Sequence, residues 1–390
     1  MNVPILNLKA QYQALKAEIE PRLLETAASQ MFVLGSEVEA LESELSTLSG
    51  TACAVGVSSG TDAILVALMG LGIGPGDAVL TTPFTFFATA GTISRSGARP
   101  VFADIDPATF NLDPARAEEA LAAFRKKEPG VRVKAVLPVH LYGQCAEMDG
   151  FTALAGRHGL AVIEDACQAV GADYPSAAGV RRACSIGTVG ALSFYPTKNL
   201  GGFGDGGMVL TNDPGLGSRL RRLRVHGGKD QYIHEEIGGN FRLDALQAVV
   251  LRVKLRHLAD WQKKRRTVAE GYERKFTAAG LVEKGWIVPP TAVYRDSGAA
   301  EFHTYHQYVV RAADRDKLQA FLRENGVGTA VFYPIPLHLQ KCFAHLGYGE
   351  GDFPVAEKAA KDVLALPMYA ELKDEEQDYV VERIAAFYRR

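Results

Sequence analysis

Short apolar runs alternate with amphipathic stretches along the first part of this chain. The runs have the length of buried strands, and the stretches between them repeat their apolar residues at helical spacing. Strands that alternate with helices in this way indicate an α/β protein, with a mostly parallel sheet covered by helices on both faces. The predicted strands are 54–57, 78–81, 101–104, 135–139, 160–165, 191–194 and 208–211.

Signals at helix ends place several of the helices between these strands. A helical pattern runs from residue 8 to residue 30, and Ser36 with Glu39 predicts a capping box for the next helix. Asp113 followed by Pro114 is typical of a helix start. No helix fits between the last two predicted strands, so the alternation is interrupted there.

The pattern changes near Arg242, where a long helical stretch begins that is rich in arginine and lysine and runs from Leu243 to Phe276. After Gly280 the sequence predicts a smaller region, with strands at 304–310 and 329–333 and helices at 317–324 and 375–388. We therefore expect two domains, a large one over residues 1–255 and a smaller C-terminal α/β domain over residues 256–390.

The composition excludes several classes of partner. With 390 residues, 47% of them hydrophobic, the chain can bury a large core. A formal net charge of −2 gives no indication of a nucleic-acid partner or of an anionic membrane surface. Five scattered cysteines without a CxxC pair favour reduced thiols in a cytoplasmic protein. The N-terminus lacks the layout of a signal peptide, and no apolar run is long enough to span a bilayer.

One lysine stands out from its surroundings. Lys198 is the only charged residue between Arg182 and Asp205; it follows an apolar run and precedes a glycine-rich stretch. A poorly hydrated ammonium has a lowered pKa, which makes the lysine a nucleophilic amine suited to Schiff-base chemistry. The glycines would let the backbone approach a bound group closely. We therefore expect Lys198 to hold an aldehyde.

Pyridoxal phosphate is an aldehyde of this kind, and it needs a carboxylate to keep its ring nitrogen protonated. Glu164 and Asp165 end a predicted strand, where successive side chains point to opposite faces, so only one of the two is expected to face the ligand. Gln168 could donate to a ring substituent such as the phenolate.

A phosphate needs backbone N–H groups or hydroxyls. A strand leads through Ser58-Ser59-Gly60-Thr61 into a helix, and this layout favours an anion at the helix N-terminus. Ser193 offers a hydroxyl close in sequence to Lys198, and Phe86 could stack on an aromatic ring.

Two other patterns do not indicate ligand sites. The glycines from Gly70 to Gly76 follow a predicted helix rather than opening one, so they indicate a helix end and a turn. His303 and His306 are expected on opposite faces of a strand, which argues against a metal there.

Several motifs together resemble the DegT/DnrJ/EryC1/StrS aminotransferases, fold-type I pyridoxal-phosphate enzymes that aminate keto groups of nucleotide-linked sugars. The resemblance covers nearly the whole chain and implies a large, mostly parallel seven-stranded sheet domain with a smaller α/β domain. The motifs are SFYPTKNLGGFGDGG around Lys198, VIEDACQAVGA around Asp165, SSGTDA at 58–63, TPFTFFATA at 82–90, GGNFRLDALQA at 238–248, LPVHLYGQ at 137–144 and VFYPIPLHLQ at 331–340.

The resemblance implies a role for each matching residue. Lys198 would form the internal Schiff base and shuttle the proton, and Asp165 would pair with the ring nitrogen. Asn240 would reach the phosphate of the partner subunit, so two shared sites imply a homodimer. Among the other positions, Gln168 would bond the ring phenolate, Gly60, Thr61 and Ser193 would hold the phosphate, Phe86 would occupy the ring-stacking place, and His226, Tyr333 and His338 would contact the substrate.

The implied reaction transfers an amino group, with L-glutamate as the expected donor, to a nucleotide-linked keto-sugar for surface polysaccharide or glycoconjugate. The YPIPLH motif favours sugar carbon 3 over carbon 4. The segment 175–183 is longer than usual, and in the loop 227–239 Lys229 is the only cation beside histidine, so the sugar is left open. Two alternatives also remain: a pyridoxal-phosphate lyase or dehydratase, and a non-catalytic regulator that kept the cofactor pocket.

Overall fold

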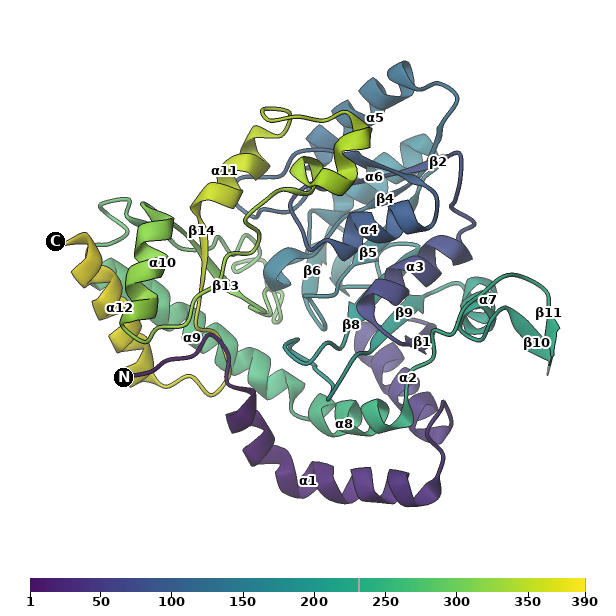
Figure 1. Ribbon diagram of the computed structural model, residues 1–390, viewed down its shortest axis with the longest axis horizontal. Helices are drawn as coiled ribbons and strands as arrows, with labels where there is room; N and C mark the ends of the chain where they lie inside the picture. Colours follow the sequence, from purple (N-terminus) through teal and green to yellow (C-terminus); the bar gives the residue numbers. More distant parts are fainter. Residues whose placement is uncertain (231, 390) are drawn as a thin grey trace.

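A seven-stranded sheet forms the centre of the computed structural model, which describes residues 1–230 and 232–389 (Figure 1). The strand order is β1-β9-β8-β5-β4-β2-β3, and β9 runs antiparallel to both neighbours while the other pairs are parallel. The predicted mostly parallel sheet and its interruption before the last strand are confirmed. The strands are β1 (Cys53–Val57), β2 (Asp77–Thr81), β3 (Arg99–Phe102), β4 (Arg132–Leu137), β5 (Ala161–Asp165), β8 (Val189–Ser193) and β9 (Gly207–Thr211).

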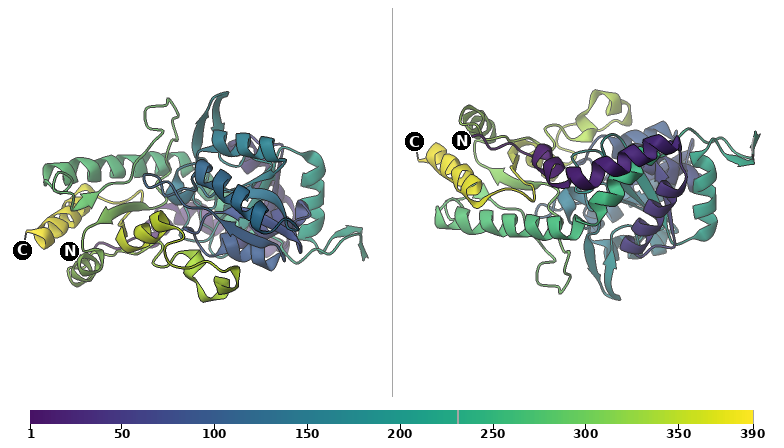
Figure 2. Two further views of the ribbon diagram at one scale, coloured as in Figure 1. Left: turned by 90° about the horizontal axis from the view of Figure 1, so that it is seen from above. Right: turned by 90° about the horizontal axis from the view of Figure 1, so that it is seen from below.

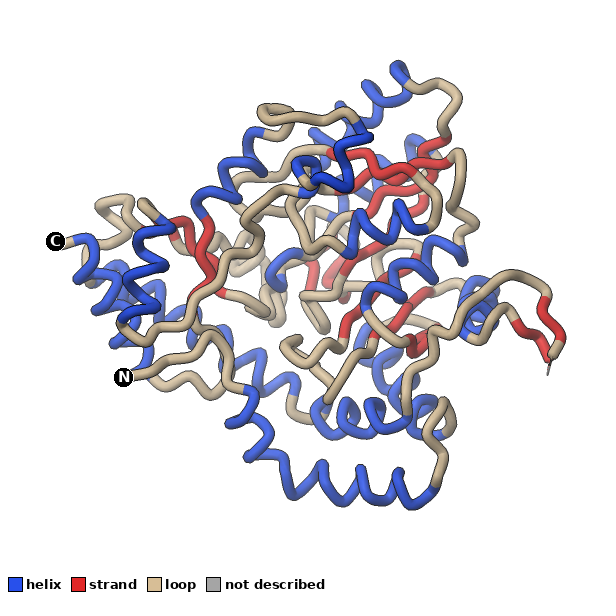
Figure 3. Tube along the Cα trace, viewed as in Figure 1, coloured by secondary structure: helices blue, strands red, loops and turns tan. Residues whose placement is uncertain are grey.

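Helices cover both faces of this sheet, as Figure 3 shows in blue around the red strands. Adjacent strand residues enter different cores: Val55 packs with α3 (Gly60–Gly70) and α4 (Ala88–Arg95), whereas Ala54 packs with the helices of the other face. This alternation explains why the strands read as continuous apolar runs. The other face is covered by α2 (Ser36–Ser49), α5 (Pro114–Lys127), α6 (Met148–His158) and α8 (Ala245–Leu255), and α7 (Pro214–Arg224) joins the first face.

The two predicted helix starts have different outcomes. Asp113 caps α5 by accepting hydrogen bonds from the N–H groups of Ala115 and Arg116, which confirms that prediction. The capping box at Ser36 is wrong, because Ser36 is already the first residue of α2 and Gly35 occupies the N-cap with φ +82°. A serine inside the helix has helical dihedrals and cannot cap the N–H groups that follow it.

The C-terminal region is built on a small antiparallel sheet. The predicted single helical stretch is interrupted by a turn, so α8 ends at Leu255 and a separate helix begins at Leu258. The predicted strand at 304–310 begins only at Tyr308, and 329–333 is no strand, since only Ala330 forms a bridge, to Ala365. The division at 255/256 falls between two helices and stays a prediction. The elements are α9 (Leu258–Ala278), β12 (Ile287–Val288), β13 (Tyr308–Ala312), α10 (Arg315–Glu324), α11 (Pro354–Asp362), β14 (Val363–Leu366) and α12 (Asp374–Tyr388).

The N-terminal segment crosses to this small region before the first long helix begins. Val3 forms a parallel bridge with Val327, and Ile5 accepts a hydrogen bond from the N–H of Met368. The two ends of the chain therefore lie on the same side of the molecule (Figure 1). Helix α1 (Leu8–Ser29) follows and packs on α8, where a helix was predicted.

Two hairpins complete the fold, β6–β7 (Asp173–Ser176, Gly179–Arg182) and β10–β11 (Gly228–Asp230, Ile233–His234). The second projects away from the body of the molecule (Figure 2). The unusually long segment at 175–183 is the tip and return strand of the first hairpin. None of the helices within residues 1–230 and 232–389 has the length and apolar character needed to cross a bilayer.

Candidate active site

A cavity of about 720 Å³ opens where β5 and β8 end and α3 begins. Ligands of α/β sheets bind at such carboxyl ends of strands. The cavity brings together most of the predicted site residues. Its lining includes Lys198, Asp165, Gln168, Ser193, Gly60, Thr61, Phe86 and Tyr333.

Lys198 lies in the loop that follows β8, held by a 2.8 Å hydrogen bond from its N–H to the carbonyl of Tyr195. Burial lowers the pKa of its amine, and the nearby Cys167 and Asp165 oppose that shift only in part. No hydrogen bond or ion pair engages its Nζ among the described residues. A desolvated amine without a partner is available as a nucleophile.

The N-terminus of α3 forms the opposite end of the cavity. Ser59 caps the helix by accepting from the N–H of Asp62, which leaves the N–H groups of Gly60 and Thr61 for an anion. A side chain at Gly60 would collide with Ser193, because an added Cβ would lie 2.9 Å from its Oγ. The serine hydroxyl thus lies directly beside the helix N-terminus, and together they form a cradle for a phosphate.

Asp165 ends β5 on the cavity side. Its Oδ2 accepts from Thr89 Oγ1 at 2.8 Å, and its Oδ1 accepts from the N–H of Cys167 at 3.2 Å. Its main chain is held on both sides as well, since its N–H donates to Pro138 and its carbonyl accepts from the N–H of His140. Among the described residues, the carboxylate accepts hydrogen bonds from neutral donors only.

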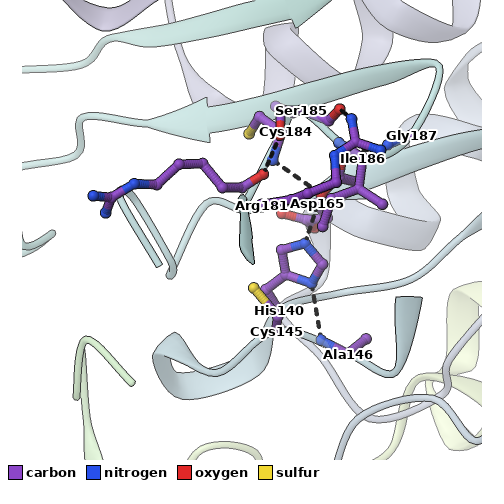
Figure 4. Close-up of polar contacts among 12 residues, drawn as sticks. His140, Cys145, Ala146, Asp165, Arg181, Cys184, Ser185, Ile186 and Gly187 are labelled. Carbon is purple, nitrogen blue, oxygen red and sulfur yellow. Dashed lines mark hydrogen bonds and ion pairs between the residues drawn. The ribbon is translucent and has the colours of Figure 1, made fainter. Parts of the chain in front are cut away.

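Glu164 points to the other face of β5 and is fully buried. Oε1 accepts from the N–H groups of Ile186 and Gly187 at 2.8 and 2.6 Å, and Oε2 accepts from the N–H of Cys184 at 2.9 Å. His140 Nε2 lies 3.0 Å from Oε2, and its Nδ1 accepts from the N–H of Ala146. Figure 4 shows His140 and the segment Cys184–Gly187, which carry these donors, gathered together. Glu164 and Asp165 therefore point to opposite faces of β5, as predicted from the sequence.

Gln168 is oriented by two tyrosines. Its Oε1 accepts from the N–H of Tyr142 at 2.7 Å, and its Nε2 donates to the hydroxyl of Tyr333 at 3.0 Å. Burial raises the pKa of Tyr333, so this hydroxyl stays protonated. The donor end of the amide therefore faces the cavity, as a bond to a ring phenolate requires. Phe86 exposes 57% of its surface in the single chain, and its ring centroid lies 6.3 Å from that of Tyr333.

Three predicted site residues do not line this cavity. Asn240 and His226 lie at the base of the projecting β10–β11 hairpin, where Asn240 forms a bridge with Val225. His338 is buried, and its Nε2 lies 3.1 Å from Glu357, so the side chain already has a partner. Within one chain the structure does not bring these three to Lys198.

Several residues that line the cavity had no predicted role, among them Thr89 and His306. Thr89, which orients Asp165, lies in the TPFTFFATA motif but had no assigned role. His306 lines the cavity. The prediction that His303 and His306 lie on opposite faces of a strand is wrong, because both histidines precede β13; His303 stacks on Tyr305. No cluster of three or more metal-binding side chains occurs in the part of the chain that the structure describes.

Comparisons with known proteins agree with this geometry. The model of the DegT/DnrJ/EryC1/StrS aminotransferase family matches residues 13–385. The chain is 50% identical to the "Pleiotropic regulatory protein" of Geobacillus stearothermophilus, covering 100% of this chain and 99% of the relative. It is 42% identical to the UDP-N-acetyl-3-dehydro-alpha-D-glucosamine 3-aminotransferase of Acidithiobacillus ferrooxidans, covering 100% and 97%.

Two solved structures are similar over the full chain. DesV of S. venezuelae, in complex with a ketimine intermediate, has a TM-score of 0.90 at 40% identity and covers 100% of this chain and 99% of its own. NtdA of Bacillus subtilis, with bound cofactor PMP, has a TM-score of 0.88 at 32% identity and covers 100% and 86%. The unpartnered lysine, the oriented carboxylate and the phosphate cradle of this chain fit the same cofactor.

Proposed function

This chain belongs to the DegT/DnrJ/EryC1/StrS aminotransferase family and is a pyridoxal-phosphate-dependent sugar aminotransferase, and we propose that it moves an amino group from L-glutamate to carbon 3 of a nucleotide-linked keto-sugar. The observation that carries the proposal is the unpartnered amine of Lys198 in one cavity with the oriented carboxylate of Asp165. When bound, the cofactor supplies an electron sink for the bonds at the reacting carbon.

The residues of the cavity have separate tasks in this reaction. Lys198 would hold the cofactor aldehyde through its amine, and the same amine would serve as the base that moves a proton. Asp165 would keep the ring nitrogen protonated, and Gln168, whose Oε1 is held by the N–H of Tyr142, would donate from Nε2 to the ring oxygen. The helix N-terminus with Ser193 would hold the phosphate, and Phe86 would stack on the cofactor ring.

Turnover tests the reaction directly. The purified enzyme should convert a nucleotide-linked 3-keto-sugar to the 3-amino product with L-glutamate as donor, and 2-oxoglutarate should form in equal amount. A retained cofactor that glutamate never converts to its amine form would favour the regulator, the alternative suggested by the name of the Geobacillus relative. Loss of a sugar hydroxyl without uptake of an amino group would favour the dehydratase. A product aminated at carbon 4 would change the assigned position on the sugar but would leave the proposed amination reaction intact.

The sugar itself is proposed to be neutral, such as a 6-deoxy keto-sugar. In the hairpin loop Lys229 forms an ion pair with Glu235 at 3.1 Å, and Glu236 forms an ion pair with Arg219 at 2.8 Å. Lys198 is the only lysine or arginine in the described lining of the cavity. A sugar carboxylate would need a free arginine or lysine. A clear kinetic preference for the uronate, measured beside the neutral sugar, would overturn this assignment.

We further propose a homodimer in which Asn240 completes the cofactor site of its partner, since Asn240 lies outside the cavity of its own chain. Lys198→Ala and Asn240→Trp should each be nearly inactive as homodimers. When the two are unfolded together and refolded, roughly half the dimers are mixed and each carries one sound site, so about a quarter of wild-type activity should return. No recovery, with mixed dimers confirmed by mass, would refute the shared site.

Two further assignments belong to this proposal. The five cysteines are all free, which suits a reducing compartment, and we place the enzyme in the cytoplasm. We also propose that residues 1–255 and 256–390 act as the cofactor-binding domain and the smaller domain.

A further inference from the structure

The loop before β13 contributes two adjacent polar side chains to the cavity, His306 and Gln307. Neither has an assigned role. His306 contacts Asn199, the residue after Lys198, so a substrate held at Lys198 would lie close to this loop. What the two side chains can recognise depends on which of their atoms remain without a partner.

The tautomer of His306 follows from a short chain of hydrogen bonds. Asn199 Nδ2 donates to the carbonyl of Thr304 at 2.9 Å, which fixes the amide with its oxygen turned to the imidazole. Asn199 Oδ1 then lies 3.2 Å from His306 Nδ1. Because an amide oxygen only accepts, the imidazole carries its proton on Nδ1, and Nε2 keeps a lone pair.

The remaining nitrogen of His306 faces the cavity. Asn199 is buried and does not line the cavity, so the ring edge turned away from it is the one left for a ligand. Nε2 has no hydrogen-bond partner among the described residues. Burial lowers the pKa of His306 well below its usual value, and the charges of Lys198 and Arg265 lower it further. The imidazole is therefore a neutral acceptor.

Gln307 adds a second group of the same kind. Its Oε1 is buried and has no hydrogen-bond partner in the described chain. A buried amide oxygen without a partner costs free energy. Gln307 lines the cavity, so a turn of its side chain lets a ligand N–H or O–H recover that free energy. Because a carboxylate offers only acceptors, it cannot satisfy these atoms.

We propose that His306 and Gln307 form a neutral hydrogen-bonding subsite that binds a hydroxyl or amide substituent of the sugar ring beside its reacting carbon. The inference rests on the proposed nucleotide-sugar amination and specifies which substituent chemistry that substrate carries. Asn199 follows Lys198 directly in the chain, so the loop that carries the reacting lysine also orients the acceptor of the subsite.

Binding to the holoenzyme tests the subsite without turnover. The probes are UDP-glucose and dTDP-glucose, which lack the keto group, and their 2-deoxy and 4-deoxy analogues; calorimetry gives each Kd. His306→Phe and Gln307→Leu should each weaken glucose-probe binding roughly threefold to tenfold, the value of one neutral hydrogen bond. One deoxy analogue should bind each variant as tightly as it binds wild type, because the hydroxyl that made the bond is already gone.

The control is His303→Phe, which changes a buried histidine of the same loop that does not line the cavity. It should leave every Kd unchanged even if it lowers the melting temperature. Should His306→Phe not retain cofactor, Gln307→Leu and the wild-type comparison of the deoxy analogues still decide the matter. Equal losses for all probes, or no loss, would overturn the subsite. Failure of the proposed function is distinct, because wild type would then neither bind these probes nor aminate any keto-sugar.

Discussion

Adjacent carboxylates on β5 serve opposite sides of the same sheet. Glu164 has both oxygens filled by four N–H donors and no contact with solvent. Asp165 accepts from a hydroxyl and one N–H and keeps a face open to the cavity. The hydrogen bonds of Glu164 join β5 to the segment that leads into β8. Those of Asp165 leave part of its carboxylate available to a ligand. The cavity side of β5 is therefore distinguished from the structural side by polar atoms that still lack hydrogen-bond partners, more than by shifted pKa values alone.

Two lysines repeat this contrast around the glycine-rich loop. Burial lowers the pKa of both amines, for Lys254 to about 8. Lys254 nevertheless donates to the carbonyl of Gly201 at 2.7 Å and lies over the ring of Phe203, so it fastens the loop from behind. Lys198, on the same loop, has no such partner in the described residues. Burial makes both amines weak bases, but only the unpartnered one can react.

The largest effect is expected at Lys198. Lys198→Ala should abolish covalent attachment of the cofactor and its visible absorbance, and should lower the glutamate half-reaction by several orders of magnitude, because nucleophile and proton carrier are lost together. Stopped-flow absorbance and borohydride reduction measure this. Lys264→Ala, which removes an exposed lysine of α9, is the control and should behave as wild type. Cofactor that borohydride still fixes to the alanine variant would rule out Lys198.

Asp165→Asn should follow, with the half-reaction slowed by about 100-fold or more, a loss typical of one oriented electrostatic contact. Stability should change little, because the asparagine oxygen can still accept from Thr89 or Cys167. Cofactor should still bind, with its ring nitrogen largely unprotonated. The rate of the half-reaction and the urea unfolding curve, measured on the same preparation, separate the effect on catalysis from the effect on stability.

Glu164→Gln should show the reverse pattern. Either orientation of the amide places its NH₂ against two N–H donors, so the free energy of unfolding should fall by about 2–4 kcal/mol. Activity per folded, cofactor-loaded molecule should remain close to wild type. If Glu164→Gln cripples the chemistry while Asp165→Asn is mild, the face of β5 has been assigned wrongly.

The smallest effect concerns the pH dependence of stability through Lys254. Its folded pKa of about 8 lies below the ordinary lysine pKa of 10.5, so between these values the unfolded chain binds more protons. The free energy of unfolding should therefore rise with pH in that window, by about 1 kcal/mol from pH 8 to pH 9, relative to Lys254→Met. Urea unfolding of both proteins at pH 7, 8 and 9 measures the difference. Parallel curves would mean that Lys254 titrates normally.

Local patterns predicted the large sheet better than the small region. The strands around the cavity are buried on both faces, so each appears as an apolar run whatever its neighbours are. The segment 329–333 has the same local character, yet it pairs only through Ala330. Likewise, the helical periodicity continues across the turn between α8 and α9. Packing between distant segments decides such cases, and periodicity does not report it.

By itself, the sequence determined the alternating architecture, the isolated lysine and the pair of carboxylates from which one had to be chosen. Those features depend on neighbours along the chain, through burial, strand parity and helix-end chemistry. Strand parity left Glu164 and Asp165 open, and the family resemblance favoured Asp165. The tertiary structure places Asp165 at the cavity, and it alone brought His306 there. Asn199 and His306, whose contact orients the imidazole, are 107 residues apart, and no local pattern carries information across that distance.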